Sequence, residues 1–431
     1  MRHVCTSPDR HPGFAARRVA AALIPFLFAT AAAAQTSSEP TPASSRRAPA
    51  QPPQSLMLAV SLFGGSSETA LESGVDPQAV GPYADADASL TYQHRSGRAT
   101  VAVSGQSVVR HAREAFTPMR QQGSVAFTAA GARQQFHASQ SVGYTPYYQF
   151  GGMTQLTLMP LSDAAQSHGD LANTDLSTIA ATTDVDWNKT LSERVALSAM
   201  YNRRSTTFGR SNLDMITQSA GARLSRRVSR FAALRTGYTY RFADSAFNAV
   251  RLREHDLDLG LDYSRPVTAS GRTTVSFGSG SSITPQDEGL AFRLTGDAAL
   301  TRLLGRTWNA RIGANRSVQL LEGFAEPVLA NVVNLGLSGT LQRRVAVSSW
   351  ASLSTGTVGL SAATGNGYEN WSAGGGLSVM VGRRGTFDAQ YFIAGDRFED
   401  GVILPPGLSA ERRQRQGLRA GFSWRGFLVG R

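Results

Sequence analysis

Few residues of this 431-residue chain have the types and spacing that catalysis requires. A serine close to a histidine is the pairing that acyl transfer uses, and His94 and Ser96 flank Arg95 in this way. We interpret this segment as a polar turn, because no asparagine motif lies beside it. His255 and Asp256 are adjacent in an alternating stretch, so their side chains would point to opposite faces of a strand. The sequence therefore predicts that the protein is not an enzyme.

Metal and thiol chemistry are also not expected. His111, His137, His168 and His255 are scattered without the spacing of metal ligands. The single cysteine, Cys5, lies in a segment that we expect to be removed, which would leave a mature chain without thiols. We predict no metal site and no cofactor.

The regularly spaced charges point instead to a polar surface on one face of many strands. Between Asp256 and Tyr263, carboxylates alternate with leucines, which is the period of a strand. Such charges would either face one another across water, where they orient polar solutes, or pair locally and satisfy a polar interior. The sequence leaves both open. The predicted inward cations are Arg223, Arg235, Arg241, Arg293, Arg311, Arg415 and Arg419, and the predicted inward carboxylates are Asp184, Asp186, Asp256, Asp258 and Asp262.

The elements that carry these charges are separated by a regular series of turns. Short turns, most with an arginine, are predicted at 95–98, 130–133, 191–194, 225–230, 265–272, 303–306, 342–345 and 382–385. Longer connections are predicted at 67–83, 110–120, 144–175, 208–212, 243–253, 284–289, 321–328, 357–367 and 398–410. The strands between them are expected at 56–66, 84–94, 99–109, 121–130, 134–143, 176–190, 195–207, 213–225, 230–242, 254–264, 272–283, 290–302, 307–320, 329–342, 345–356, 368–382, 385–397 and 411–424. This pattern predicts an all-β transmembrane antiparallel up-and-down barrel of eighteen strands, with sixteen as the alternative.

The side-chain alternation indicates which face of each strand meets lipid. Phe292, Leu294 and Leu335 would face lipid, whereas Arg293 and Asn334 would face the interior. Aromatic residues near the strand ends would form two interfacial girdles. They are Trp187, Phe231, Tyr263, Trp308, Phe387 and Trp424 near the short turns, and Tyr144, Tyr240, Phe242, Phe292, Tyr368 and Trp371 near the long connections. A propeller shares the repeat length, but each repeat here divides into two long strands and not four short ones.

Composition and the first residues agree with an exported membrane protein. The formal net charge is +12, but the arginines are dispersed through turns and strand faces, so nucleic acid is not an expected partner. Residues 1–34 resemble a signal peptide, with a basic start, a short apolar run over Val19 to Ala29 and small residues at Ala32 to Ala34. Residues 35–55 are rich in proline and serine and are expected to be a disordered periplasmic segment. The barrel would occupy 56–431.

These features together resemble Gram-negative outer-membrane β-barrels, and among them the porin-like barrels of about eighteen strands, some of which accompany exopolysaccharide export. The resemblance rests on pattern over nearly the whole chain after Ser55 and on no diagnostic motif. It implies a location in the cell outer membrane, contact with outer-membrane lipid and insertion by the barrel-assembly machinery. The leading expectation is passive passage of small polar solutes. A polysaccharide conduit and a non-conducting structural or adhesive barrel are the alternatives, and the oligomeric state is left open.

The third long connection, 144–175, is the longest and has an aromatic segment. In general porins, which this chain resembles, the third external loop folds inward and narrows the pore. Tyr147, Tyr148 and Phe150 are therefore candidates for a constriction on which sugar rings would stack. The alternative is that they belong to the outer aromatic girdle.

Overall fold

The computed structural model describes most of the chain after residue 53. The described residues are 54–71, 74–75, 81–112, 115–146, 177–209, 214–245, 251–268, 271–286, 289–319, 327–359, 366–402, 404 and 413–429. Every regular element in these ranges is a strand. Within them, no helix is long and apolar enough to cross a membrane. The expected signal peptide and nearly all of the proline-rich segment lie outside the described residues and stay predictions.

The strands are long, and nearly all have 12 to 18 residues. They are β1 (Gln54–Leu71), β2 (Gly74–Val75), β3 (Gly81–Ser96), β4 (Ala99–Ala112), β5 (Ala115–Ala130), β6 (Gln134–Thr145), β7 (Thr178–Ser192), β8 (Val195–Phe208), β9 (Met215–Arg227), β10 (Ala232–Ser245), β11 (Arg251–Pro266), β12 (Thr273–Gln286), β13 (Gly289–Leu304), β14 (Trp308–Gln319), β15 (Val328–Gln342), β16 (Val345–Val358), β17 (Gly367–Val381), β18 (Gly385–Phe398) and β19 (Arg413–Val429).

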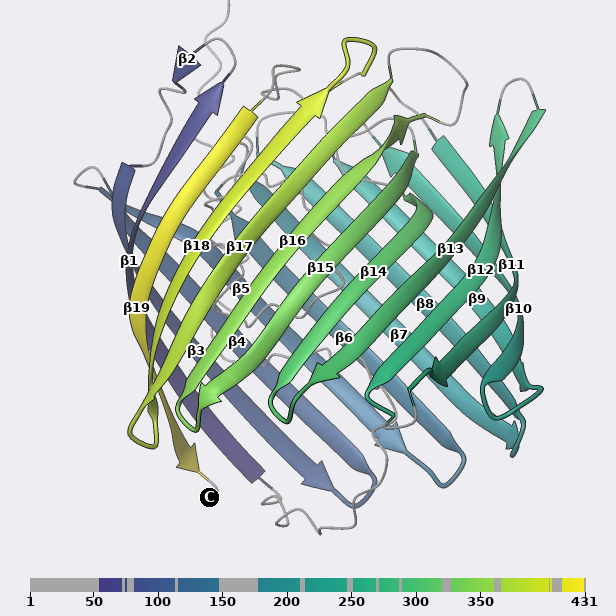
Figure 1. Ribbon diagram of the computed structural model, residues 1–431, viewed down its shortest axis with the longest axis horizontal. Coiled ribbons are helices and arrows are strands. Elements are labelled where there is room, and N and C mark those ends of the chain that lie inside the picture. The colour runs from purple at the N-terminus through teal and green to yellow at the C-terminus, as the bar shows by residue number, and fades with distance from the viewer. Residues whose placement is uncertain are drawn as a thin grey trace, which may run out of the picture.

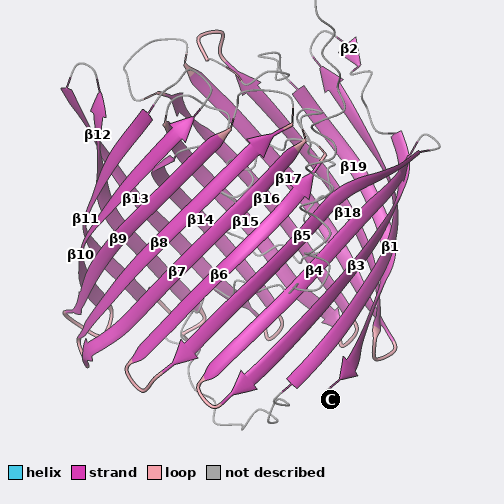
Figure 2. Cartoon of the chain, turned by 180° about the vertical axis from the view of Figure 1, so that it is seen from behind, coloured by secondary structure: helices cyan, strands magenta, loops and turns pink. Residues whose placement is uncertain are grey.

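The sheet closes on itself (Figure 1). Each long strand pairs antiparallel with the next, and β1 pairs with β19 from Leu56–Val429 to Leu71–Arg413, which leaves no open edge. Of the nineteen strands in the sheet, β2 is a two-residue strand that pairs only with the end of β1, so eighteen long strands form the wall. This confirms the predicted antiparallel barrel and excludes both the sixteen-strand alternative and the propeller. The same tilted wall is seen from behind in Figure 2.

The short turns all lie at one end of the barrel (Figure 1). Several contain a glycine in the left-handed region, with φ of 54° at Gly97, 67° at Gly305 and 73° at Gly382. A residue with a Cβ is strained at such angles, so glycine suits these tight hairpins. The turn signals in the sequence thus mark the real strand junctions.

The predicted strand ends were too short at the opposite end of the barrel. β1 continues to Leu71 and pairs there with β19, beyond the predicted end at residue 66. β4 and β5 extend to Ala112 and from Ala115, so most of the predicted connection 110–120 is a hairpin. In β1 the polar residues 67–69 occupy both faces, and in β5 Pro118 and the register shift opposite Val108 and Val109 interrupt the alternation. Neither extension therefore has the regular apolar alternation by which the sequence would reveal a strand.

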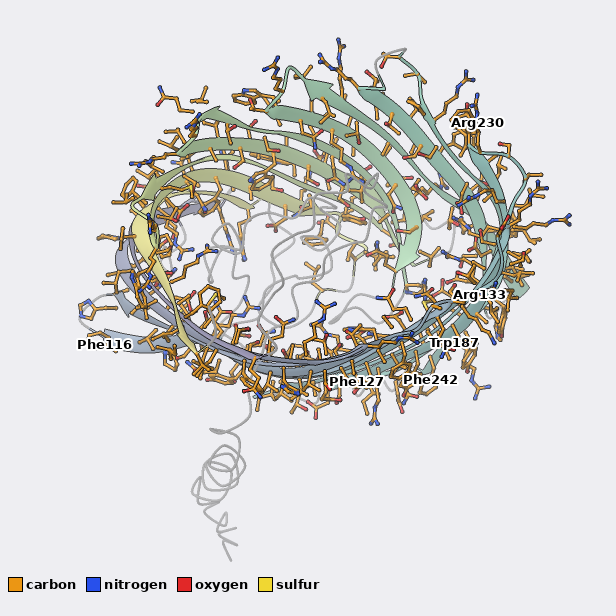
Figure 3. The ribbon with its side chains drawn as sticks, turned by 90° about the horizontal axis from the view of Figure 1, so that it is seen from below. Phe116, Phe127, Arg133, Trp187, Arg230 and Phe242 are labelled. Atoms are coloured by element: carbon orange, nitrogen blue, oxygen red, sulfur yellow. The ribbon has the colours of Figure 1, made fainter. Side chains whose placement is uncertain are left out.

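The barrel has its apolar side chains outside and many of its polar side chains inside. Leu259 and Leu294 are 67% and 64% exposed, whereas Glu254 and Arg419 are 0% and 3% exposed. Figure 3 shows Phe127, Trp187 and Phe242 on the outside of the ring. An apolar outer wall of this kind meets lipid, which places the protein in the outer membrane.

One predicted girdle residue faces the other way. Tyr368 pairs in register with Gly356 and Phe398, is only 4% exposed, and its hydroxyl lies 3.1 Å from the Ser354 hydroxyl. Trp371, three residues further, is on the opposite, lipid-facing side because neighbouring positions alternate. The prediction that both belong to the outer girdle was therefore wrong for Tyr368, which lies inside the barrel.

Candidate pore lining

The strand register connects the candidate residues across the wall. Directly paired residues of antiparallel strands share a face. Asp184 pairs with Asn202, Asn202 with Ser219, Ser219 with Arg241, and Arg241 with Glu254, so this face is continuous across five strands. Because Phe242 points outward, this continuous face is the inner one. The register places all twelve candidates on it, namely Arg223, Arg235, Arg241, Arg293, Arg311, Arg415, Arg419, Asp184, Asp186, Asp256, Asp258 and Asp262.

The arginines of β9 and β10 pair with carboxylates of the neighbouring strand β11. Asp258 forms ion pairs with two of them. Its Oδ1 accepts a hydrogen bond from Arg235 Nε at 2.7 Å, and its Oδ2 lies 2.7 Å from Arg223 Nε. Arg241 Nη2 lies 2.9 Å from Asp256 and its Nη1 lies 3.3 Å from Glu254. In this part of the wall the charges are thus local ion pairs and not rows that face each other across the channel.

Arg235 also fills an interruption in the wall. The β11–β12 pairing stops after Leu257–Ser281 and resumes at Tyr263–Phe277, so five residues of β11 stand against three of β12. Arg235 reaches this gap from β10 and donates from Nη2 to the Ser279 carbonyl oxygen at 2.8 Å. Its Nη1 also contacts Asp262. The guanidinium therefore supplies a hydrogen bond to a backbone group that the neighbouring strand does not satisfy.

Glycines make room for this side chain. A Cβ on Gly260 would lie 1.9 Å from the Ser279 oxygen and 3.2 Å from Arg235 Nη2. A Cβ on Gly278 would lie 3.3 Å from both Arg235 Nη1 and Asp262 Oδ1. Side chains at these positions would push the guanidinium off the wall. The glycines of β11 and β12 and the arginine of β10 thus form one packed unit.

Glu254 belongs to the same network and lies at its end nearer the long connections. It is not among the candidates identified from the sequence. It is fully buried, and it accepts a hydrogen bond from the Ser282 hydroxyl at 2.8 Å. Arg241 Nη1 lies close to it and also donates to the Val318 carbonyl oxygen at 3.1 Å. The sequence could have indicated Glu254, since it lies two residues before Asp256 and so on the same face of the strand. It was missed because it is the first residue of the predicted strand 254–264.

A second ion pair lies on the wall near the first strands and was also missed. Arg110 donates from Nε and Nη2 to the two oxygens of Asp85 at 2.7 and 2.8 Å, and the two side chains are 3% and 0% exposed. The guanidinium also lies 3.6 Å from the centre of the Tyr83 ring. The sequence places Arg110 in the predicted connection 110–120, so it does not predict this pair.

The candidates of β19 lie across the barrel from the β9–β11 network, on the strand that closes the sheet (Figure 3). Arg415 and Arg419 are 6% and 3% exposed, and Arg413 beside them is 7% exposed. The Arg419 guanidinium stacks over Phe63 of β1 at 3.9 Å. These arginines are therefore packed into the wall by their neighbours and are not freely exposed to water.

The remaining candidates have simpler surroundings. Asp184 accepts a hydrogen bond from Asn202, and Arg293 Nη1 donates to the Phe292 carbonyl oxygen at 3.0 Å. Asp186 is exposed and lies in register with His137. The constriction candidates Tyr147, Tyr148 and Phe150 lie outside the described residues, so the constriction stays a prediction.

Comparisons with known proteins give matches only among solved structures, and those at low sequence identity. No family model and no curated protein sequence matches the chain. Among solved structures, OccK2 of Pseudomonas aeruginosa is 10% identical with a TM-score of 0.46, and OpdQ of the same organism is 9% identical with a TM-score of 0.47. For both, the likeness covers 87% of this chain and 98% of the other. OmpT, an outer membrane protein of Vibrio cholerae compared as a loop-deletion mutant, is 9% identical with a TM-score of 0.38, over 86% of this chain and all of the other.

The chain is an outer-membrane β-barrel. This statement rests on the closed register of β1 with β19 and on the apolar outer wall. The resemblances describe only the path of the chain.

Proposed function

We propose that the barrel is a passive channel for small polar solutes and that it performs no enzymatic step. The observation that carries this proposal is a closed wall whose inner face is polar. Eighteen strands about 4.8 Å apart, tilted by roughly 40°, enclose a backbone ring about 35 Å across if the section is circular. A ring of that size is too wide for wall side chains alone to fill.

The pairing of charges along the wall supports weak charge selectivity. The network of β9 to β11 has three arginines and four carboxylates, and each of the three arginines has an acidic partner. Its most exposed charged side chains are Arg223 and Asp262, at 50% and 44%. Since these two have opposite sign, the water beside this sector of the wall meets a nearly neutral surface. Neutral and zwitterionic polar solutes are therefore the expected cargo.

The test is single-channel conductance of the refolded full chain in planar bilayers. A channel of the proposed kind gives stable steps and a reversal potential close to zero in a salt gradient. Liposome swelling with sugars and amino acids of increasing size then measures the cutoff. Absence of both conductance and swelling would favour a non-conducting barrel. Current that only a long oligosaccharide blocks, without entry of small solutes, would favour a polysaccharide conduit.

A further inference from the structure

On the outer face of β8 to β11, the side chains become more polar from the short turns towards the long connections, as a lipid does from its acyl chains to its headgroup. Near the short turns its outward residues are apolar, with Leu224, Leu234 and Leu259 at 39%, 52% and 67% exposure. Further along the strands come Tyr201 and Tyr238, and then two outward arginines, Arg203 and Arg253. Acyl chains, the interfacial region and charged headgroups would be met in that order.

The two arginines belong to one row of the sheet. Arg203 pairs in register with Gln218, Gln218 with Phe242, and Phe242 with Arg253. Phe242 points away from the barrel (Figure 3), so the whole row does. Three strand spacings separate the arginine backbones, which is about 14 Å. Long arginine side chains at this separation can contact the same headgroup from two sides.

Their height on the wall corresponds to the outer headgroup region. Arg226, next to the β9–β10 turn, pairs with Val195, and Arg203 lies eight residues further along β8. Eight residues span about 26 Å along the strand, or about 20 Å along the membrane normal at a tilt of roughly 40°. The apolar band of such barrels is about 25 Å tall. For a band that begins at Val195, Arg203 lies about 5 Å inside the outer edge, a distance that a long arginine side chain spans. Arg253, in the same row, lies two residues from the start of β11 at the end with the long connections.

Among the described residues, no acidic side chain forms an ion pair with Arg203 or with Arg253. Asp244, the next outward position on β10, is in register with Arg251. By contrast, the outward Arg397 of β18 is directly in register with Glu369 of β17. An arginine at the edge of the hydrocarbon needs an anion or water, and the anion present at that depth is the lipid phosphate.

We propose that the outward face of β8 to β11 binds the phosphorylated headgroup of an outer-leaflet lipid through Arg203 and Arg253. Phe242 and Tyr240, between the two arginines, would pack against the upper parts of its acyl chains or its sugar. The inference does not depend on the conduction of solutes. It assigns to this sector of the wall a bound lipid that orients the barrel in its membrane.

The experiment uses the full chain purified in detergent and a diphosphorylated disaccharide glycolipid (lipid A), with the same lipid after removal of its phosphates as the comparison. Native mass spectrometry measures the affinity for each. We expect the phosphorylated lipid to bind at least about tenfold more tightly. The double variant Arg203→Gln with Arg253→Gln should reduce that preference to about threefold or less, whereas Arg397→Gln, the matched outward arginine, should leave it unchanged.

Equal binding of the two lipids by the natural chain would overturn the proposal, and so would full retention of the preference in the double variant. An equal loss in Arg397→Gln would show unspecific charge attraction and would also overturn it. Displacement of the lipid by inorganic phosphate alone would indicate a free-phosphate site and count against a lipid one. Each variant is first checked for the heat-dependent gel shift of a folded barrel. The comparison of the two lipids on the natural chain decides the matter even if the double variant does not fold.

Discussion

Replacement of Arg235 by methionine tests whether a side chain holds the β11–β12 wall together. Methionine keeps most of the volume but removes three contacts, to Asp258 (2.7 Å), to Asp262 and to the Ser279 carbonyl oxygen (2.8 Å). Asp258 keeps Arg223 as a partner. Asp262 is 44% exposed, so water replaces part of its lost interaction. The Ser279 carbonyl oxygen loses the donor that Arg235 Nη2 supplies.

The expected cost follows from these contacts. A buried backbone acceptor without a partner costs about 1–3 kcal/mol. Removal of one member of a buried ion pair costs about 3–5 kcal/mol. The cost is smaller here, because Asp258 keeps a second partner and Asp262 is nearly half exposed to water. The sum is a loss of about 2–4 kcal/mol in the free energy of unfolding. Urea unfolding in lipid vesicles, followed by tryptophan fluorescence, measures it.

A matched variant and a local probe make the test specific. Arg223→Met removes a half-exposed arginine that also forms an ion pair with Asp258, and it should cost no more than about 1 kcal/mol. Hydrogen exchange in Arg235→Met should accelerate at 258–262 of β11 and 278–280 of β12, where these two strands do not pair with each other. The acceleration should be much smaller in β15 to β17. An equal cost for the two variants, or exchange unchanged at the interruption, would refute the reasoning.

Three further predictions concern the rest of the wall. Leu335→Arg on the outer face should cost roughly 2–4 kcal/mol in vesicle unfolding, whereas Ser338→Arg on the inner face should cost far less; similar costs would mean that the faces are assigned wrongly. Asp85→Asn should cost about 3–5 kcal/mol in the free energy of unfolding, because it removes the carboxylate that pairs with the buried Arg110. A double-mutant cycle with Arg110→Met should show strong coupling between the two side chains, and additive costs would contradict the pairing. Deletion of residues 151–170 should raise single-channel conductance if the third external loop constricts the pore, and an unchanged conductance would place that loop outside it.

The strands and their two faces were predictable because a single local rule determines them. Alternation fixes which side chains share a face, and glycines such as Gly97 and Gly382, with positive φ, mark the turns. The rule fails where a proline or a bulge interrupts the alternation. For this reason the sequence predicts that β5 begins at residue 121 and not at Ala115, since Pro118 and the register shift beside it lie between the two. Arg110, which stands opposite Thr117 in that part of β5, was therefore not recognised as part of the wall.

The chemistry of the inner face was less predictable because it depends on which residues stand opposite each other. The inward arginines and carboxylates were identified by parity, yet parity alone could not show that Asp258 serves both Arg223 and Arg235. The interruption in the β11–β12 ladder illustrates the limit. It shifts the register by two residues, since Leu257 opposes Ser281 but Tyr263 opposes Phe277. A shift of two returns every side chain to its original face, so the alternation of the sequence is the same with or without it. Only the position of Arg235, bonded to a carbonyl that the opposite strand leaves unpaired, shows that the wall is completed there by a side chain.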